Sequence, residues 1–389
     1  MIYLFYFFFC SLFISQSMMD ISSALLLIAS FYIIIRQSDL KNDFLKSLQN
    51  SKDFLILILL WLIQLGLGYW LSPVPQNEAW KYISDIKYIL MGFVFLTILR
   101  NQFFINFKTE KIMTLLIILI SLAQIPLFLT DPDPEPRLGG FMKNPMTLAH
   151  GYGLWMIYLF DKLTRIEIKK NQETFLYITA LAVGSVVILL TMTRGVWLAL
   201  AVAFMVMAWM RSKKVFLGLI LSGSMALGIL LMVSQKFKDR LFYSLSPENY
   251  DQIRWNLWKA NWEIIKDHPL FGAGYGLNKE LLMTYFEKLQ IKDNIMISHS
   301  HNQIIHWTAG TGIIGLSLLL IFFFKIWKRA KDIQQHSQQT YALITAMLVY
   351  FFVGGLFEAN FEHSKYKYML MFALVLGFSF QSLNKKTNS

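Results

Sequence analysis

The sequence is poor in charge and in cysteine. Only 15% of its 389 residues are charged, whereas 56% are hydrophobic, and the mean hydropathy is +0.47. A soluble domain of this length carries far more charge, which excludes an ordinary soluble protein. The one cysteine, Cys10, cannot form an intrachain disulfide, so cysteine usage says nothing about the compartment.

Other features are missing as well. The apolar N-terminal residues 1–16 lack the basic leader and the A-x-A cleavage site of a secretory signal peptide, so we expect a retained first helix. The apolar runs do not alternate with polar residues, which argues against a transmembrane barrel. The net charge of +12 would suggest nucleic acid in a soluble protein, but basic cytoplasmic loops explain it in a membrane protein. We expect membrane lipids, and no nucleic acid, as partners.

Apolar runs long enough to cross a bilayer recur along the whole chain. Because lipid leaves backbone polar groups no partner outside the segment, such runs must be helices. The sequence predicts an all-α, polytopic membrane protein with about twelve transmembrane helices, at 1–17, 20–35, 54–72, 83–99, 112–130, 146–160, 174–191, 195–210, 215–234, 302–324, 340–357 and 367–382. We divide this membrane domain into N-terminal helices, helices with outer motif loops, one long helical loop and C-terminal helices, at 1–130, 131–234, 235–299 and 300–389.

The distribution of lysine and arginine predicts the orientation. If both termini are cytoplasmic, twenty basic residues fall in inner loops and seven in short outer connections. The remaining nine lie in the loop 235–299, and long loops count little in this rule. The pattern therefore predicts cytoplasmic termini and a periplasmic long loop, in a bacterial inner membrane.

A polar cluster precedes the span 302–324. It contains His299, His301, Asn302 and Gln303. A histidine titrates near neutrality and can take a proton from an attacking hydroxyl, and a helix start disfavours its charged form. The alternative is an interfacial polar cap, followed by glycines that allow close helix packing.

Two arginines are candidates for binding phosphate. Arg194 lies in a tight outer turn and has the planar fork of donors that suits phosphate, but a snorkelling interfacial arginine is the simpler explanation. Arg254 could as easily pair with Glu248 or Asp251 as with a substrate. It precedes Trp255, Trp258 and Trp262, which with Ile265 form one apolar stripe at helical spacing. We expect this stripe to pack, or to lie at the membrane interface, rather than to bind sugar.

Two further patterns are weak as ligand sites. The stretch 268–276 is rich in glycine, but no strand precedes it, so we expect a turn in which backbone approaches another segment closely. Asp131 and Asp133 have D-x-D spacing, yet alternating prolines favour a spacer, and we expect no metal.

Taken in order, these segments resemble the O-antigen ligase and polymerase superfamily of bacterial envelope glycosyltransferases, over about residues 130–360. The ligase pattern is complete: His301, Asn302, nine residues, Gly312, two residues and Gly315. Three other segments are similar to elements of the family: 193–197 around Arg194, 254–274 in the long loop and 137–145 upstream.

The resemblance implies a reaction. Such ligases move an O-polysaccharide from undecaprenyl diphosphate to a sugar hydroxyl of lipid A–core oligosaccharide at the periplasmic face, inverting the glycosidic bond without a cofactor or metal. By the resemblance, His301 is the catalytic base and Arg194 and Arg254 bind the diphosphate. The supporting residues are Asn302, Gln303, His299, Gly312, Gly315, Arg137 and Lys143.

Several alternatives stay open. A polymerase and a protein O-oligosaccharyltransferase of the same superfamily would share the outer arginines. His299 could take the role of base or orient His301. A twelve-helix transporter would show repeated halves and charges at mid-membrane, and the sequence has no such symmetry.

Overall fold

The computed structural model describes residues 2–74, 107–130, 137–165, 172–242, 250–293, 295–334 and 337–379. All regular structure within these ranges is helical. The helices of the first half are α1 (Ile2–Ile14), α2 (Gln16–Arg36), α3 (Ser38–Gln49), α4 (Lys52–Trp70), α7 (Phe107–Leu129), the short 3₁₀ helix η1 (Gly140–Met142), α8 (Pro145–Arg165) and α9 (Gln172–Leu190). Those of the second half are α10 (Arg194–Arg211), α11 (Lys213–Val233), α12 (Gln235–Phe242), α13 (Tyr250–Asp267), η3 (Asn278–Leu281), α14 (Leu282–Lys288), α15 (Gln303–Asp332), α16 (Gln338–Gly355), η4 (Asn360–Glu362) and α17 (Ser364–Ser379).

Seven helices in the described ranges are long and apolar enough to cross a membrane: α2, α4, α7, α9, α10, α11 and α15. Four more coincide with predicted spans but are shorter or more polar: α1, α8, α16 and α17. The predicted span at 83–99 lies outside the described residues. The all-helical class is thus confirmed, and the number twelve stays a prediction.

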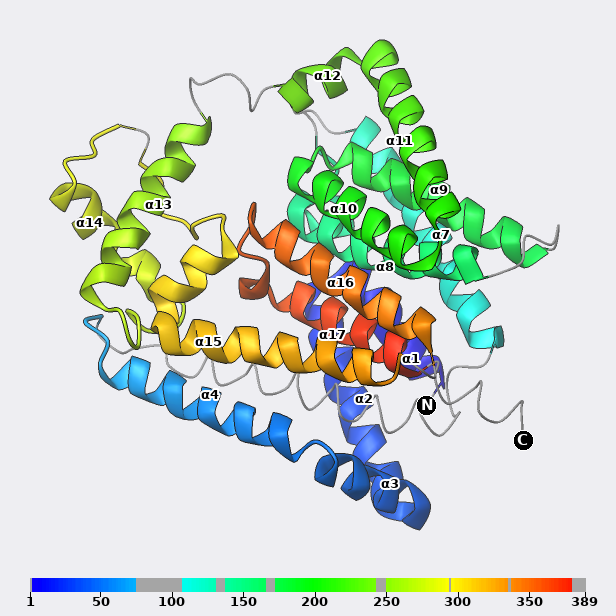
Figure 1. Ribbon diagram of the computed structural model, residues 1–389, viewed down its shortest axis with the longest axis horizontal. Helices are drawn as coiled ribbons and strands as arrows, with labels where there is room; N and C mark the ends of the chain where they lie inside the picture. Colours follow the sequence, from blue (N-terminus) through cyan, green and yellow to red (C-terminus); the bar gives the residue numbers. More distant parts are fainter. Residues whose placement is uncertain are drawn as a thin grey trace.

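The bundle has a core of buried helices and an apolar exposed surface. Residues 147–159 of α8 and 366–377 of α17 are buried on every side, so these two helices form its centre, with α1, α10 and α16 around them (Figure 1). By contrast, α11 has no buried residue although it is strongly apolar. A helix that is hydrophobic all round needs an apolar environment, and the bilayer supplies it for α11.

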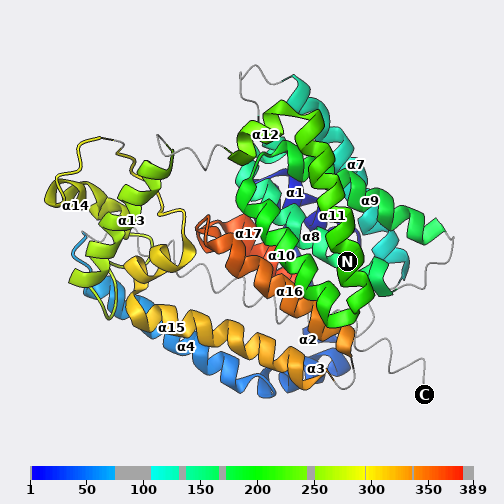
Figure 2. The same ribbon diagram turned by 45° about the horizontal axis from the view of Figure 1, so that its top comes forward.

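The helices α4 and α15 run side by side away from this bundle toward α13 and α14 (Figures 1 and 2). Lys325 binds Asp53 at 2.8 Å near one end of the pair, and Gln64 donates to the carbonyl of Thr311 at 2.7 Å near the other. The pair is therefore antiparallel. It carries the long loop on its far end, next to the start of α15.

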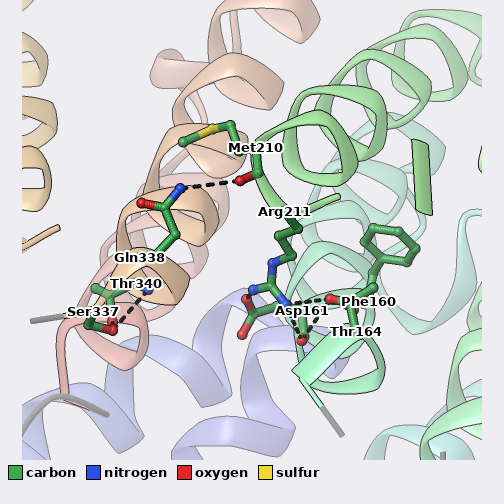
Figure 3. A network of polar contacts seen from close by, with 8 residues as sticks. All are labelled: Phe160, Asp161, Thr164, Met210, Arg211, Ser337, Gln338 and Thr340. Atoms are coloured by element: carbon green, nitrogen blue, oxygen red, sulfur yellow. Dashed lines mark hydrogen bonds and ion pairs between the residues drawn. The ribbon is translucent and has the colours of Figure 1, made fainter. Parts of the chain in front are cut away.

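A polar network fixes the other end of the bundle (Figure 3). Arg211, the last residue of α10, forms an ion pair with Asp161 of α8 and also donates to Thr164. The side chain of Gln338, at the start of α16, donates to the carbonyl of Met210 at 3.2 Å. Because α10 ends where α16 starts, the two helices are antiparallel, and the start of α10 lies beside the end of α16.

We predict that Arg211→Met destabilises the protein by about 3–5 kcal/mol, because it leaves the carboxylate of Asp161, whose side chain is fully buried, without its cation. Thermal unfolding of the detergent-purified protein measures this. Lys325→Met is the matched control, since it breaks the exposed pair with Asp53 and should cost no more than about 1 kcal/mol. Equal effects of the two substitutions would contradict the prediction.

Candidate active site

Two histidines flank one buried glutamate. Glu358 lies in the connection between α16 and α17 and is only 2% exposed. One of its carboxylate oxygens is 3.1 Å from Nδ1 of His301, and the other contacts Nε2 of His299. The two imidazole rings lie 4.3 Å apart between centroids. The structure thus joins the polar cluster before α15 to a residue 57 positions further along the chain.

The charge on Glu358 is set by these neighbours. Burial alone would raise the pKa of its carboxyl, but hydrogen bonds and charges from His299 and His301 outweigh burial and hold this pKa well below its usual range. The carboxylate is therefore ionised at neutral pH. Because an ionised carboxylate only accepts hydrogen bonds, Nδ1 of His301 is the donor, and a neutral ring with this hydrogen bond has its lone pair on Nε2.

The start of α15 holds His301 in place. Asn302 caps the helix, since its side-chain oxygen accepts from the backbone N–H of Ile304 and Ile305. Gln303 is buried, and its side-chain oxygen accepts from the N–H of Phe361 at 2.7 Å. His301 itself adopts a left-handed backbone with φ 49°. This costly conformation turns its ring toward Glu358 and persists because both following residues are anchored.

Arg194 is the first residue of α10, which packs along α16. A side chain at Gly195 would meet Phe357, whose Cβ is 2.7 Å from the ideal Cβ position. The backbone after Arg194 thus rests on the residue before Glu358. Arg194 as a whole is half-buried at this end of the bundle.

Arg137 supports the turn that carries Arg194. Its guanidinium donates to the carbonyl of Thr191 at 3.1 Å and to the hydroxyl of Thr193 at 3.2 Å. Lys143, by contrast, is exposed at the end of η1 in a left-handed conformation. The two residues share an upstream segment but differ in role: Arg137 shapes the Arg194 turn, while Lys143 faces outward.

Arg254 belongs to α13, which reaches the same centre by another contact. The indole of Trp258, one turn after Arg254, donates to the carbonyl of Ser300 at 2.8 Å, next to His301. Further along α13, Asn261 accepts from Asn278, whose side-chain nitrogen lies 3.2 Å from Nδ1 of His306. These contacts fix α13 against the start of α15, and Arg254 with it.

The tryptophan stripe is not the packing face of α13. Trp255 and Trp262 are 51% and 55% exposed, so our expectation that the stripe packs is wrong for these two residues. The buried face consists of Leu257, Ala260 and Ile264, which pack in a small core with α14. Exposed tryptophans on a helix suit an interfacial position, the other alternative from the sequence.

The glycine-rich segment enters a break in α15. At Gly312 the backbone leaves helical geometry, with φ 65° and ψ −174°. The loop fills the gap: Ala273 donates to the carbonyl of Ala309 at 2.8 Å, and the carbonyl of Pro269 accepts from Ile313 at 2.9 Å. At Gly272, with φ 71°, a Cβ would lie 2.5 Å from the backbone of Gly310. The predicted close approach of backbone is thus found, and α15 is its partner.

Gly315 also serves close packing, because a side chain there would meet Thr311 at 2.3 Å. In the ligase-type pattern, His301 and Asn302 therefore start the helix, Gly312 admits the loop, and Gly315 leaves room for Thr311 and for Gln64 of α4. The two predicted acidic residues Asp131 and Asp133 lie outside the described residues.

Glu358 was missed by the sequence analysis. The signal was present, since an ionisable residue at the end of a membrane span is a functional candidate by default. It was overlooked because it lies outside the ligase pattern and is separated from His301 by the whole of α15 and α16.

The repeated apolar helices define a multi-pass, all-helical membrane protein, and a His–Glu–His cluster lies at one end of its bundle. Residues 179–320 match the family model for O-antigen ligase, so the chain is similar to that family over this segment. The match confirms the resemblance over those residues, which include Arg194, Arg254 and His301, while Glu358 lies beyond it. No curated protein matches the chain.

We predict that Gly312→Ala destabilises the protein by about 1–3 kcal/mol, because a Cβ there would lie 2.1 Å from the carbonyl oxygen of Leu270 in a left-handed conformation. Proteolysis of the long loop and the unfolding temperature both report this. Gly223→Ala on α11 is the control, since nothing lies within 4 Å of its Cβ position, and alanine should be neutral or stabilising there. If Gly312→Ala changed neither the proteolysis of the long loop nor the unfolding temperature, the prediction would be contradicted.

Proposed function

We propose that this protein is an O-antigen ligase, which transfers a polysaccharide from undecaprenyl diphosphate to a sugar hydroxyl of lipid A–core oligosaccharide. The observation that carries the proposal is the Glu358–His301 contact inside a chain whose residues 179–320 match the ligase family. The complete ligase-type pattern from His301 to Gly315 favours this reaction over a polymerase or a protein O-oligosaccharyltransferase.

The tautomer of His301 determines which atom accepts the proton of the acceptor hydroxyl. Glu358 accepts from Nδ1, so Nε2 is free to take the proton of the acceptor hydroxyl. The hydroxyl oxygen bonds to the anomeric carbon as the bond from that carbon to the carrier phosphate breaks. The electron pair leaves with the diphosphate, and the configuration inverts. The imidazolium that forms is stabilised by the carboxylate of Glu358.

The two arginines compensate the charge of the leaving diphosphate. A guanidinium stays charged and offers a planar fork of donors to phosphate oxygens. Gly195 against Phe357 and Trp258 against Ser300 support a position of both Arg194 and Arg254 around the Glu358 centre. With this charge compensated, the leaving group needs no protonation.

The face of the membrane follows from the basic residues in the short loops. Their excess in one set of loops supports cytoplasmic termini, which puts α13, Arg194 and Glu358 on the periplasmic side. The undecaprenyl-linked donor and the lipid A–core acceptor would then meet the site from the outer leaflet.

We predict that His301→Ala lowers transfer by roughly 10²–10⁴-fold, because the general base is lost. The measurement is transfer of undecaprenyl-linked polysaccharide to lipid A–core by purified protein. His268→Ala is the matched control, since His268 follows α13, away from the described contacts of Glu358. Normal transfer by a well-folded His301→Ala protein would remove His301 from the chemistry. In cells that lack this protein, lipid A–core that carries single repeat units, rather than bare core, would favour the polymerase.

We further predict that Arg194→Lys and Arg254→Lys each lower transfer on the order of 10²-fold, because lysine lacks the two-pronged donor geometry that a diphosphate uses. Arg36→Lys on α2 is the control for the exchange itself. Full activity of either variant would show that the arginine contributes only its positive charge and does not bind the diphosphate through two donors.

A further inference from the structure

The pair of histidines around Glu358 has a second chemical capacity. Nitrogen atoms of His299 and His301 and an oxygen of Glu358 all lie within 4.8 Å of one another, and His301 and Glu358 are buried. We propose that these three residues bind a divalent transition metal, with zinc as the ion they suit best, and that the bound ion switches off His301 as a base. The second half of this inference rests on the proposed function, whereas the first does not.

The spacing is close to that of a coordination shell. Zinc binds imidazole nitrogen and carboxylate oxygen at about 2.0–2.2 Å, so two ligands of a tetrahedral ion are roughly 3.3–3.6 Å apart. Nδ1 of His301 and its facing oxygen on Glu358 are 3.1 Å apart, already near this edge length. Nε2 of His299 contacts the other oxygen. All three ligand atoms lie within 4.8 Å of one another, so the longest separation has to shorten by little more than 1 Å for them to surround one ion.

The donor set selects the kind of ion. Two imidazoles and one carboxylate, with a fourth position left for water, are a ligand set that zinc uses in proteins. Calcium and magnesium prefer six or more oxygen ligands, and this group offers one carboxylate. The three residues come from the two segments that Gln303 and Asn302 already tie together, so the site exists before an ion arrives.

Metal binding and base catalysis exclude each other at the imidazole of His301. A metal on Nδ1 of His301 displaces the proton that this atom donates to Glu358. A neutral imidazole ligand keeps its single proton on the other nitrogen. Nε2, which carries the lone pair in the metal-free site, becomes an N–H donor and can no longer accept a proton from the acceptor hydroxyl. Zinc would therefore inhibit transfer without blocking the two arginines.

Titration of the full-length, detergent-purified protein with zinc chloride tests the binding. We expect one equivalent of zinc in the wild type, and X-ray absorption that shows nitrogen and oxygen ligands, with at least two imidazoles and no sulfur from Cys10. His299→Ala and Glu358→Gln should each weaken binding by at least about tenfold. His268→Ala, which removes a histidine elsewhere, should bind zinc like the wild type.

The outcomes separate the possibilities. Absence of binding at micromolar zinc, binding undiminished by both substitutions, or sulfur ligation would each overturn the site, and the spectrum of the wild type decides even if a variant fails to fold. In the transfer assay, zinc should inhibit and a chelator should restore the rate, whereas stimulation by zinc would overturn the inhibition. Zinc binding by a protein without transfer activity would refute the proposed function and leave the site standing.

Discussion

The break in α15 is the constraint on which the rest of the structure depends. A helix within lipid has to satisfy its own backbone, and an irregular backbone is tolerated only where protein supplies partners. Here the partners come from the glycine-rich loop, through the bonds from Ala273 to Ala309 and from Ile313 to Pro269. The helix and the loop each complete the other, so the long loop cannot detach without leaving the α15 backbone unpaired.

This contact between the loop and α15 positions the residues of the candidate site. Because the loop is seated on α15, α13 lies where Trp258 reaches the carbonyl of Ser300, one residue before His301. From the other side, the antiparallel packing of α10 and α16 brings Gly195 against Phe357, one residue before Glu358. Arg194, Arg254 and His301 are far apart in sequence, yet Arg194 lies next to the Gly195–Phe357 contact, and Arg254 and His301 lie near the Trp258–Ser300 contact.

The features that could be predicted from the sequence are those that depend on residues close together in the chain. Apolar length gives the helices, and the glycine-rich stretch 268–276 gives a close approach of backbone, because glycine tolerates it best. Glu358 and the role of Arg137 were not predictable in this way. A lone carboxylate after a span carries no periodic signal, and Arg137 binds Thr191 and Thr193 across a distance of more than fifty residues. Such pairings depend on how the helices assemble, and this assembly leaves no pattern among residues that are neighbours in the sequence.

The same carboxylate explains why one cluster suits both of the chemistries proposed for it, a general base and a zinc site. A proton between Glu358 and Nδ1 of His301 fixes the tautomer that a base requires, and an ion in place of that proton fixes the opposite tautomer. The second imidazole, His299, binds the other oxygen and so stabilises either arrangement. A site that orients a base by a buried carboxylate and a neighbouring histidine therefore carries most of a zinc ligand set, and only the proton distinguishes the two states.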